Sequence, residues 1–289
     1  MSLYPVFARP RNLSQAQELL GSLASGVSLI AGGQELMPHV NYGVLQPDVF
    51  VDLNALPELR GVSEEDGVIA IGAATVHREV QTNPLVLEKL PLLASAAARV
   101  GGGRQVHNRG TIGGNIVSLH PLYDILPPLL ALEAEVEIAR GGEVRRVALA
   151  DAIRDTQAGL GSEAILVRVL VRPAAPGFGW AYEKLKNSGG AYGSANAAAL
   201  VSRIDGRLGA VRLIIGAVSE KLIDASPALA DLVGEVVSPA LERQIGIRCS
   251  ALVTEPLDDQ QGPAEWRRAM AGVVAGRAFS TALERAGGE

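Results

Sequence analysis

Glycine concentrated in two short stretches of the first 115 residues most constrains how this chain can fold. Gly32-Gly33 follows the apolar run Val27–Ala31, and six more glycines lie between positions 101 and 114. Glycine lets the backbone adopt positive φ and lets amide N–H groups approach a ligand closely, so that phosphate can be bound without lysine. We predict a loop at each stretch, because a packed helix or strand would not tolerate so much glycine.

Two interpretations of these loops are open on the residues alone. Tight turns also favour glycine, so a single Gly-Gly pair is usually no more than a turn. Two such loops favour a phosphate-containing ligand, because Thr111 and Asn115 add side chains that can bond ribose or phosphate oxygens. The chain has no G-x-G-x-x-G and no Gly-Lys dipeptide, which excludes the Rossmann fingerprint and the Walker loop.

Composition excludes several classes of protein. With 289 residues, 48% hydrophobic and 20% charged, the chain is globular and long enough for about two domains. The net charge of −5 and the dispersed Lys and Arg argue against nucleic acid as a partner. No apolar stretch reaches the roughly 18 residues that span a bilayer, and the N-terminus lacks a signal-peptide pattern. We therefore expect no membrane span and a cytoplasmic location.

Chemically reactive side chains are scarce. The single cysteine, Cys249, cannot supply the ligands of an iron–sulfur cluster and is predicted to be a small core residue. The four histidines are scattered and no metal or nucleophile motif occurs, so we predict no metal site and name no catalytic residue. Any redox centre in this chain must therefore be an organic cofactor.

The apolar pattern predicts helices and strands without a strict alternation, which indicates an α+β fold. Thr75 is predicted to cap a helix through His77. A linker-like composition at Arg172–Gly177 predicts a domain boundary. The predicted strands are 27–31, 49–53, 67–72, 135–139, 143–149, 178–186, 195–204 and 206–218, and the predicted helices start near Gln34 or cover 91–100, 121–132, 239–245 and 263–285.

The two glycine loops resemble a specific pair. Ala31–Leu36 and Asn108–Asn115 are similar to the FAD-binding loops in the flavoprotein (medium) subunits of molybdenum hydroxylases, the family of carbon monoxide dehydrogenase, quinoline oxidoreductase and xanthine dehydrogenase. The resemblance covers nearly the whole chain and includes Pro121–Asp124, Glu183-Lys184 and Glu265–Arg268. It implies a two-subdomain FAD-binding fold of the vanillyl-alcohol-oxidase (PCMH) type over residues 1–173, divided near residue 57 into 1–57 and 58–173. A small α+β C-terminal domain with an antiparallel sheet follows at 174–289.

The resemblance also implies one noncovalent FAD and a set of residues that contact it. Asp124 could accept hydrogen bonds from the cofactor, or could simply cap a helix, and the residues leave both readings open. The cofactor-binding positions that the resemblance implies are Leu29, Ile30, Ala31, Gly32, Gly33, Gln34, Glu35, Leu36, Gly101, Thr111, Ile112, Gly113, Gly114, Asn115, Asp124, Leu166, Lys184 and Tyr192.

By the same resemblance, the chain is an electron-transfer subunit that passes electrons from iron–sulfur clusters of a partner to an external acceptor. Molybdopterin and 2Fe–2S clusters are expected only on partner subunits, a large and a small one, in a dimer of heterotrimers. Two alternatives stay open: a self-contained FAD-dependent oxidase, and a flavin-free subunit that only bridges partners.

Two positions depart from the pattern of the family. Glu35 stands where many relatives carry a small hydroxyl residue, and a carboxylate beside a phosphate is unfavourable unless it points away. The segment Asn187–Ser194 lacks the acidic residue that relatives often have after the Glu-Lys pair. We expect Tyr192 to keep the aromatic role beside the flavin.

Overall fold

The computed structural model describes residues 5–22, 26–154, 160–161, 163–188 and 190–287. The chain forms two compact units, each assembled from three segments of sequence. Unit 1 comprises Met1–Asn83, Arg104–Ser118 and Glu133–Arg172, and unit 2 comprises Pro84–Gly103, Leu119–Leu132 and Pro173–Glu289. The domain boundary at residue 173 and the subdomain boundary near residue 57 stay predictions.

Unit 1 begins with a parallel sheet of three strands, in the order β1 (Val6–Ala8), β3 (Val49–Asp52) and β2 (Val27–Ile30). Helix α1 (Leu13–Ser22) joins β1 to β2 and helix α2 (Leu36–Asn41) joins β2 to β3, as parallel pairing requires. Ala16 and Leu20, one turn apart on α1, are buried in a cluster with Val51 of β3. Because β2 and β3 pair in parallel, both strands end at the same edge of the sheet.

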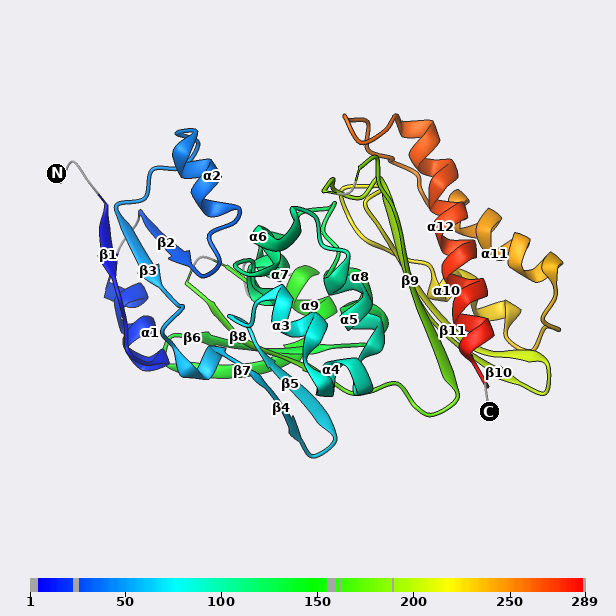
Figure 1. Cartoon of the computed structure of the whole chain (residues 1–289), viewed down its shortest axis with the longest axis horizontal. Helices are drawn as coiled ribbons and strands as arrows, with labels where there is room; N and C mark the ends of the chain where they lie inside the picture. Colours follow the sequence, from blue (N-terminus) through cyan, green and yellow to red (C-terminus); the bar gives the residue numbers. More distant parts are fainter. Residues whose placement is uncertain (1–4, 23–25, 155–159, 162, 189, 288–289) are drawn as a thin grey trace. The chain divides into compact units, whose positions relative to one another are not determined.

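The second sheet of unit 1 is antiparallel, and Figure 1 shows it crossing the middle of this unit. Two of its hairpins turn on pairs of residues with positive φ, Asp66-Gly67 and Gly141-Gly142, as two-residue hairpin loops favour. The strand order is β4 (Val62–Glu65), β5 (Val68–Gly72), β8 (Ile165–Val171), β6 (Glu135–Arg140) and β7 (Glu143–Ala148). The helices of this unit are α3 (His77–Thr82), α6 (Gly103–His107), α7 (Ile112–Ser118) and α9 (Leu149–Arg154), with a 3-10 turn at Pro57–Leu59.

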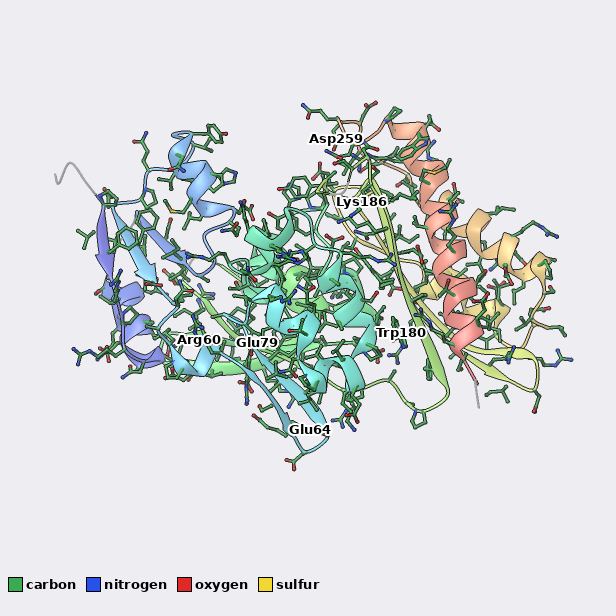
Figure 2. The ribbon with its side chains drawn as sticks, viewed as in Figure 1. Arg60, Glu64, Glu79, Trp180, Lys186 and Asp259 are labelled. Atoms are coloured by element: carbon green, nitrogen blue, oxygen red, sulfur yellow. The ribbon has the colours of Figure 1, made fainter. Side chains whose placement is uncertain are left out.

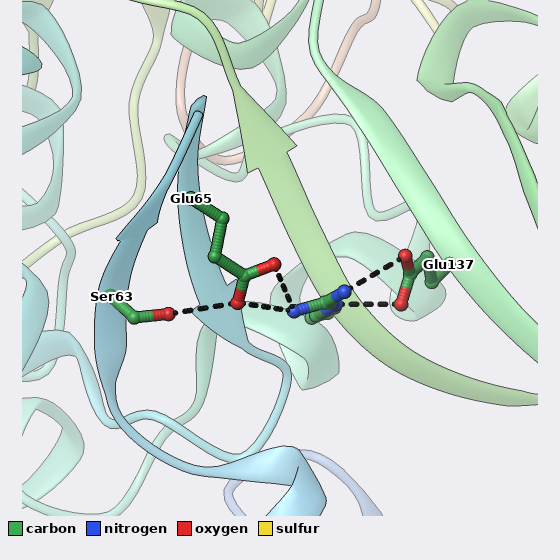
Figure 3. A network of polar contacts seen from close by, with 4 residues as sticks. Ser63, Glu65 and Glu137 are labelled. Atoms are coloured by element: carbon green, nitrogen blue, oxygen red, sulfur yellow. Dashed lines mark hydrogen bonds and ion pairs between the residues drawn. The ribbon is translucent and has the colours of Figure 1, made fainter. Parts of the chain in front are cut away.

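A charged network crosses one face of this sheet (Figure 3). Arg168 of β8 donates to Glu65 at 2.8 Å and to Glu137 at 2.6 Å, and Ser63 donates to the same Glu65 carboxylate. One guanidinium thus joins strands β4, β8 and β6. Because opposite charges across strands favour their pairing, this network stabilises the register of the sheet.

Unit 2 is built on an antiparallel sheet in the order β12 (Ile223–Asp224), β11 (Arg207–Gly216), β10 (Ala195–Ile204) and β9 (Phe178–Leu185). Figure 1 shows helices α11 and α12 on one side of this sheet and α5 and α8 on the other. The helices are α4 (Pro84–Lys89), α5 (Pro91–Ala98), α8 (Leu126–Ala131), α10 (Ser226–Leu229), α11 (Pro239–Ala251) and α12 (Ala264–Arg285), with a 3-10 turn at Ala230–Leu232.

Small residues let helix α12 lie close to the sheet of unit 2. Alanines of β10 and of α12 dominate their shared core, which also holds Phe279 and the predicted core residue Cys249. A side chain at Gly179 of β9 would meet the Ala282 carbonyl. The core therefore depends on close backbone approach as much as on large side chains.

The structure corrects the prediction that residues 101–114 form a continuous loop. Helix α6 begins at Gly103, and Gly113 and Gly114 lie inside helix α7. Gly102 and Gly103 have φ of +84° and +66°, so they supply the turn before α6. Gly113 faces Ala73, and a Cβ there would lie 2.6 Å from the Ala73 carbonyl oxygen. Glycine is thus needed inside α7 for close packing and not for a loop.

Two smaller predictions are also wrong. Thr75 does not cap α3, because the N-cap residue is Val76 without a side-chain cap, while the Thr75 hydroxyl donates to Gly61 O. The helix predicted over 121–132 is shorter and starts at Leu126. The predicted strands and the closing helices are otherwise confirmed within a few residues, as is the α+β class, except that α11 continues to Ala251.

Candidate functional site

The first glycine loop lies at the carboxyl edge of the parallel sheet in unit 1. Ile30 of β2 pairs in register with Asp52 of β3, and Leu53 N–H donates to Ile30 O at 2.9 Å, so the two strands end together. Gly33 has a φ of +67°, which favours glycine over residues with a side chain. The predicted positions follow in order: Leu29 and Ile30 in β2, Ala31–Glu35 in the loop, and Leu36 at the start of α2.

The second predicted loop is held by backbone hydrogen bonds at the start of α7. Ile112 N–H donates to Thr75 O at 2.9 Å, and Gly113 N–H donates to Ala73 O at 2.8 Å. The Thr111 hydroxyl accepts the Gly114 N–H at 3.1 Å, so it satisfies a free donor of its own helix. These contacts fix the backbone of residues 111–115 on β5 and the turn after it.

The two glycine segments pack against each other, although they are far apart in sequence. A Cβ on Gly32 would collide with the carbonyl of Arg109 and lie 2.9 Å from the Cα of Gly110. Only glycine at position 32 allows this approach. The structure therefore brings the two predicted FAD-binding loops together within unit 1.

Several polar groups at this junction have no partner. In the described part of the chain, the backbone N–H groups of Gly32, Gly33 and Gln34 donate no hydrogen bond. The Oδ1 atom of Asn115, a residue only 7% exposed, also has no partner among the described residues. Buried polar groups are nearly always satisfied, so the unpartnered Asn115 Oδ1 points to a ligand that bonds it. Backbone donors suit a pyrophosphate and an amide oxygen suits a ribityl or ribose hydroxyl, so these residues fit FAD.

Leu166, another predicted contact, lies at an irregularity of β8. Arg168 pairs with Glu137 of β6, whereas Leu166 pairs with the next residue of β6, Ile138. Because neighbours on a strand point to opposite faces, Leu166 and Arg168 point to opposite faces too. Val167, between them, accepts the Ala73 N–H at its carbonyl at 2.9 Å. This bond connects the irregular part of β8 to the turn after β5.

Unit 2 holds the other predicted positions, and two of them form an ion pair. Lys184 Nζ of β9 lies 2.7 Å from Asp124 Oδ2, and the two side chains are 1% and 4% exposed. Lys184 also donates to Arg99 O at 3.0 Å, and the Tyr182 hydroxyl donates to Asp124 Oδ1 at 2.6 Å. Asp124 is not a helix cap, because the N-cap of α8 is Ile125 without a side-chain cap. The carboxylate instead holds Lys184.

Burial decides the electrostatics of this cluster. Burial raises the pKa of the Asp124 carboxyl, while the Lys184 ammonium and the Tyr182 hydroxyl act in the opposite direction. Burial and the Asp124 charge together raise the pKa of Tyr182 well above its usual value. Tyr182 therefore stays a neutral hydrogen-bond donor, and a fully desolvated cation and anion face each other.

Gly101 and Tyr192 belong to a neighbouring region of unit 2. A Cβ on Gly101 would lie 3.2 Å from the carbonyls of Gly190 and Ala191. Tyr192, 44% exposed, stacks with His120 at a centroid distance of 5.4 Å and lies 5.9 Å from the ring of Tyr123. The segment Asn187–Ser194, of which Gly189 lies outside the described residues, thus contributes the ring of Tyr192 to a stack with His120 and Tyr123.

Sequence reasoning missed three polar residues around these sites. Asn54 donates to the carbonyl of Ala31, and Tyr182 holds Asp124. Tyr182 could have been found, because it lies two positions before Lys184 on a strand and so shares its face. Arg267 is fully buried and bonds the Gly262 carbonyl at 3.1 Å and the carboxylate of Asp259, which is labelled in Figure 2. The helical spacing of α12 indicates this burial, because Arg267 lies one turn before Ala271 on the face of Ala275 and Ala278.

Other kinds of site find no support in the described residues. No group of three or more His, Cys, Asp or Glu among them could hold a metal ion. No described helix is both long enough and apolar enough to cross a membrane. Cys249 is buried and burial raises the pKa of its thiol to about 12, so it is unreactive.

These observations fit a flavoprotein in which the first glycine loop offers backbone donors to a cofactor and the second segment offers the amide oxygen of Asn115. Comparison with known proteins makes this specific. Residues 4–173 match the family described as "FAD binding domain in molybdopterin dehydrogenase", and residues 180–282 match the "CO dehydrogenase flavoprotein C-terminal domain". The chain belongs to the family of FAD-binding medium subunits of molybdenum hydroxylases.

Relatives with known names agree along almost the whole chain. The carbon monoxide dehydrogenase medium chain of Hydrogenophaga pseudoflava is 34% identical over 278 residues, which cover 96% of each chain. A structure of that enzyme, lacking the Mo-pyranopterin moiety of its molybdenum cofactor, matches with a TM-score of 0.92 and 33% identity over 99% of each chain. Quinoline 2-oxidoreductase of Pseudomonas putida 86 matches with a TM-score of 0.88 and 28% identity, covering 98% of this chain and 99% of that one. The predicted fold, an FAD-binding domain followed by a domain with an antiparallel sheet, is confirmed.

Proposed function

We propose that this chain holds one noncovalent FAD and transfers electrons from iron–sulfur clusters of a partner subunit to an external acceptor. The observation that carries the proposal is the packing of Gly32 against Arg109 and Gly110, which joins a loop with unpaired backbone donors to the segment that leads into α7. Bound FAD supplies the redox chemistry, because it both accepts and donates electrons. The protein supplies binding, orientation and access.

In unit 1, we assign the pyrophosphate to the first glycine loop. The N–H groups of Gly32, Gly33 and Gln34 have no acceptor among the described residues, and oriented amides bind anions even in a chain of net negative charge. Asn115 offers its unpartnered amide oxygen to a hydroxyl of the same cofactor. Thr111 contributes by holding the backbone of α7, since its hydroxyl already accepts the Gly114 N–H.

In unit 2, we assign Lys184 to the flavin ring. An ammonium has three N–H donors, and two of them bind Asp124 and the Arg99 carbonyl. In the described part of the chain the third donor has no acceptor, so it can bind a carbonyl oxygen of the ring. Asp124 is a positioning residue in this proposal, because both of its oxygens already bind protein groups. Tyr192 offers an aromatic surface at the edge of the site.

We further propose a small iron–sulfur subunit and a large molybdopterin subunit as partners, in a dimer of heterotrimers. The support is that a relative named as a medium chain matches 96% of this one, and that its single cysteine is buried. We expect a permanent complex, and the interfaces of permanent complexes commonly bury about 2,000 Å² or more. The cytoplasmic location stays a prediction.

Purification of the tagged full chain from its own cells tests this function. The proposal predicts a complex in which FAD, iron and molybdenum keep a constant ratio through gel filtration. Oxidation of an aldehyde or an N-heteroaromatic compound by the isolated chain, with reduction of a dye, would instead indicate a self-contained oxidase. A complex that contains iron and molybdenum but no flavin would indicate a bridging subunit.

A further inference from the structure

Asn54 lies just beyond β3, at the edge of the sheet where the first glycine loop begins. Its Nδ2 atom donates to Ala31 O at 2.8 Å and to Asp52 Oδ1 at 2.8 Å. Asp52 Oδ1 also accepts the backbone N–H of Asn54 at 3.0 Å. Both hydrogens of the Asn54 amide are therefore used, and the side chain is held between the end of its own strand and the loop.

The orientation of this amide follows from its partners. Ala31 O and Asp52 Oδ1 are both acceptors, so the atom that faces them must be the nitrogen. The backbone of Asn54 is held as well, because Arg60 Nε donates to Asn54 O at 2.8 Å, and Arg60 lies on this side of unit 1 (Figure 2). Asn54 is thus a fixed donor and not a mobile surface side chain.

A held carbonyl fixes the direction of the next N–H. The peptide between Ala31 and Gly32 is planar and trans, so its C=O and N–H point in opposite directions. With Ala31 O bound to Asn54, the Gly32 N–H points away from β3. Gln34 Nε2 holds Gly32 O at 3.2 Å and acts in the same way on the Gly33 N–H. These are two of the amides that have no acceptor in the described part of the chain.

We propose that Asn54 is a positioning residue for the anionic part of the cofactor, because it aims the Gly32 N–H at a phosphate. This inference rests on the proposed FAD site. Asn54 need not touch the cofactor; it acts through the Ala31 peptide. Asp52 supports it by holding both the side chain and the backbone of Asn54.

Asn54→Asp is the sharpest variant, since it keeps the shape and removes the donor. The new carboxylate would face the Ala31 carbonyl and the Asp52 carboxylate, which repel it. We expect FAD to bind at least about tenfold more weakly, because a held donor is replaced by a like charge. Asn12→Asp is the matched control: it adds the same charge in unit 1, and Asn12 Oδ1 is only an acceptor for Gln15 N–H at 2.9 Å, a bond that aspartate keeps.

The test uses the full chain freed of flavin and measures its affinity for FAD by quenching of flavin fluorescence. Asn54→Ala is measured alongside, because it removes the donor without adding a charge and keeps the test valid if the aspartate variant does not fold. It is expected to weaken binding about threefold to tenfold. The amide resonance of Gly32 is followed by NMR as FAD is added, and it should shift in the wild type and in Asn12→Asp but less in the Asn54 variants.

The outcomes distinguish the positioning role of Asn54 from the FAD site on which it rests. If the wild type and folded Asn54 variants bind FAD equally and show the same Gly32 shift, the positioning role is overturned and the FAD site stands. If the wild-type chain does not bind FAD at all, the proposed function itself fails. Weaker binding by both Asn54 variants with an unchanged Asn12→Asp supports the role.

Discussion

Lys184 Nζ and Asp124 Oδ2 form an ion pair of 2.7 Å between side chains that are both at least 96% buried. A buried ion pair stabilises a protein little more than two apolar residues in its place would, but removing one partner leaves the other charge buried alone. The residues are 60 positions apart in sequence, so they join the segment before α8 to β9. Their contact makes the cluster both a structural element of unit 2 and the proposed support of the flavin ring.

Lys184→Met should destabilise the flavin-free chain by about 3 to 5 kcal/mol, because the Asp124 carboxylate loses its counter-ion in a desolvated place. Urea unfolding measures the change. Lys89→Met is the matched control, since Lys89 pairs with Glu88 at 3.2 Å but is 38% exposed, and a change within about 0.5 kcal/mol is expected. Equal losses of stability in the two variants would show that burial of the Lys184–Asp124 pair does not increase the cost of breaking it.

Gly113→Ala should destabilise unit 1 by about 1 to 3 kcal/mol, because its Cβ would lie 2.6 Å from both Ala73 Cβ and Ala73 O. Gly21→Ala is the control within a helix of the same unit. No described atom lies within 4 Å of its Cβ position, so it should stabilise the chain by about 0.4 to 1 kcal/mol. Thermal unfolding compares the two. A neutral Gly113→Ala would contradict the close approach of α7 to the turn after β5.

His77 makes stability depend on pH. Burial, and then the neighbouring His107, lower the pKa of His77 to about 4. Between that value and its usual pKa of about 6.5, the unfolded state binds more protons than the folded state, so stability falls as the pH falls. The full effect amounts to about 3 kcal/mol.

Urea unfolding from pH 7 to pH 4 tests this dependence. His77→Gln should lose less stability over that range than the wild type, because glutamine does not titrate. His39→Gln, at an exposed position of α2, should follow the wild type. Parallel curves for His77→Gln and the wild type would refute the assignment.

The sequence was most informative where a local rule decides the structure. The strand predicted at 27–31 is found as β2, which ends just before Gly32-Gly33, and the strands predicted at 135–139 and 143–149 are found as β6 and β7 on either side of Gly141-Gly142. The pairing of β10 with β11 follows from the two-residue turn at Asp205-Gly206, where both residues have positive φ. These features need no knowledge of distant contacts.

Contacts between distant segments account for what the sequence did not reveal. Gly113 looked like a loop residue, because its reason for being glycine is Ala73, which lies in another segment. Asp124 and Lys184 were both singled out, but nothing local shows that they bind each other. Asn54 was overlooked, because its role depends on the parallel pairing that brings β3 beside β2.

The flavin content of the purified full chain tests the central claim most directly. The protein is precipitated with acid, and the supernatant is separated by chromatography and compared with FAD and FMN standards. The account predicts one FAD released per chain and a colourless pellet, because the proposed site binds the cofactor through the backbone donors of the first glycine loop and through no covalent bond. A chain that carries no flavin even after incubation with excess FAD, or that releases FMN, would contradict it.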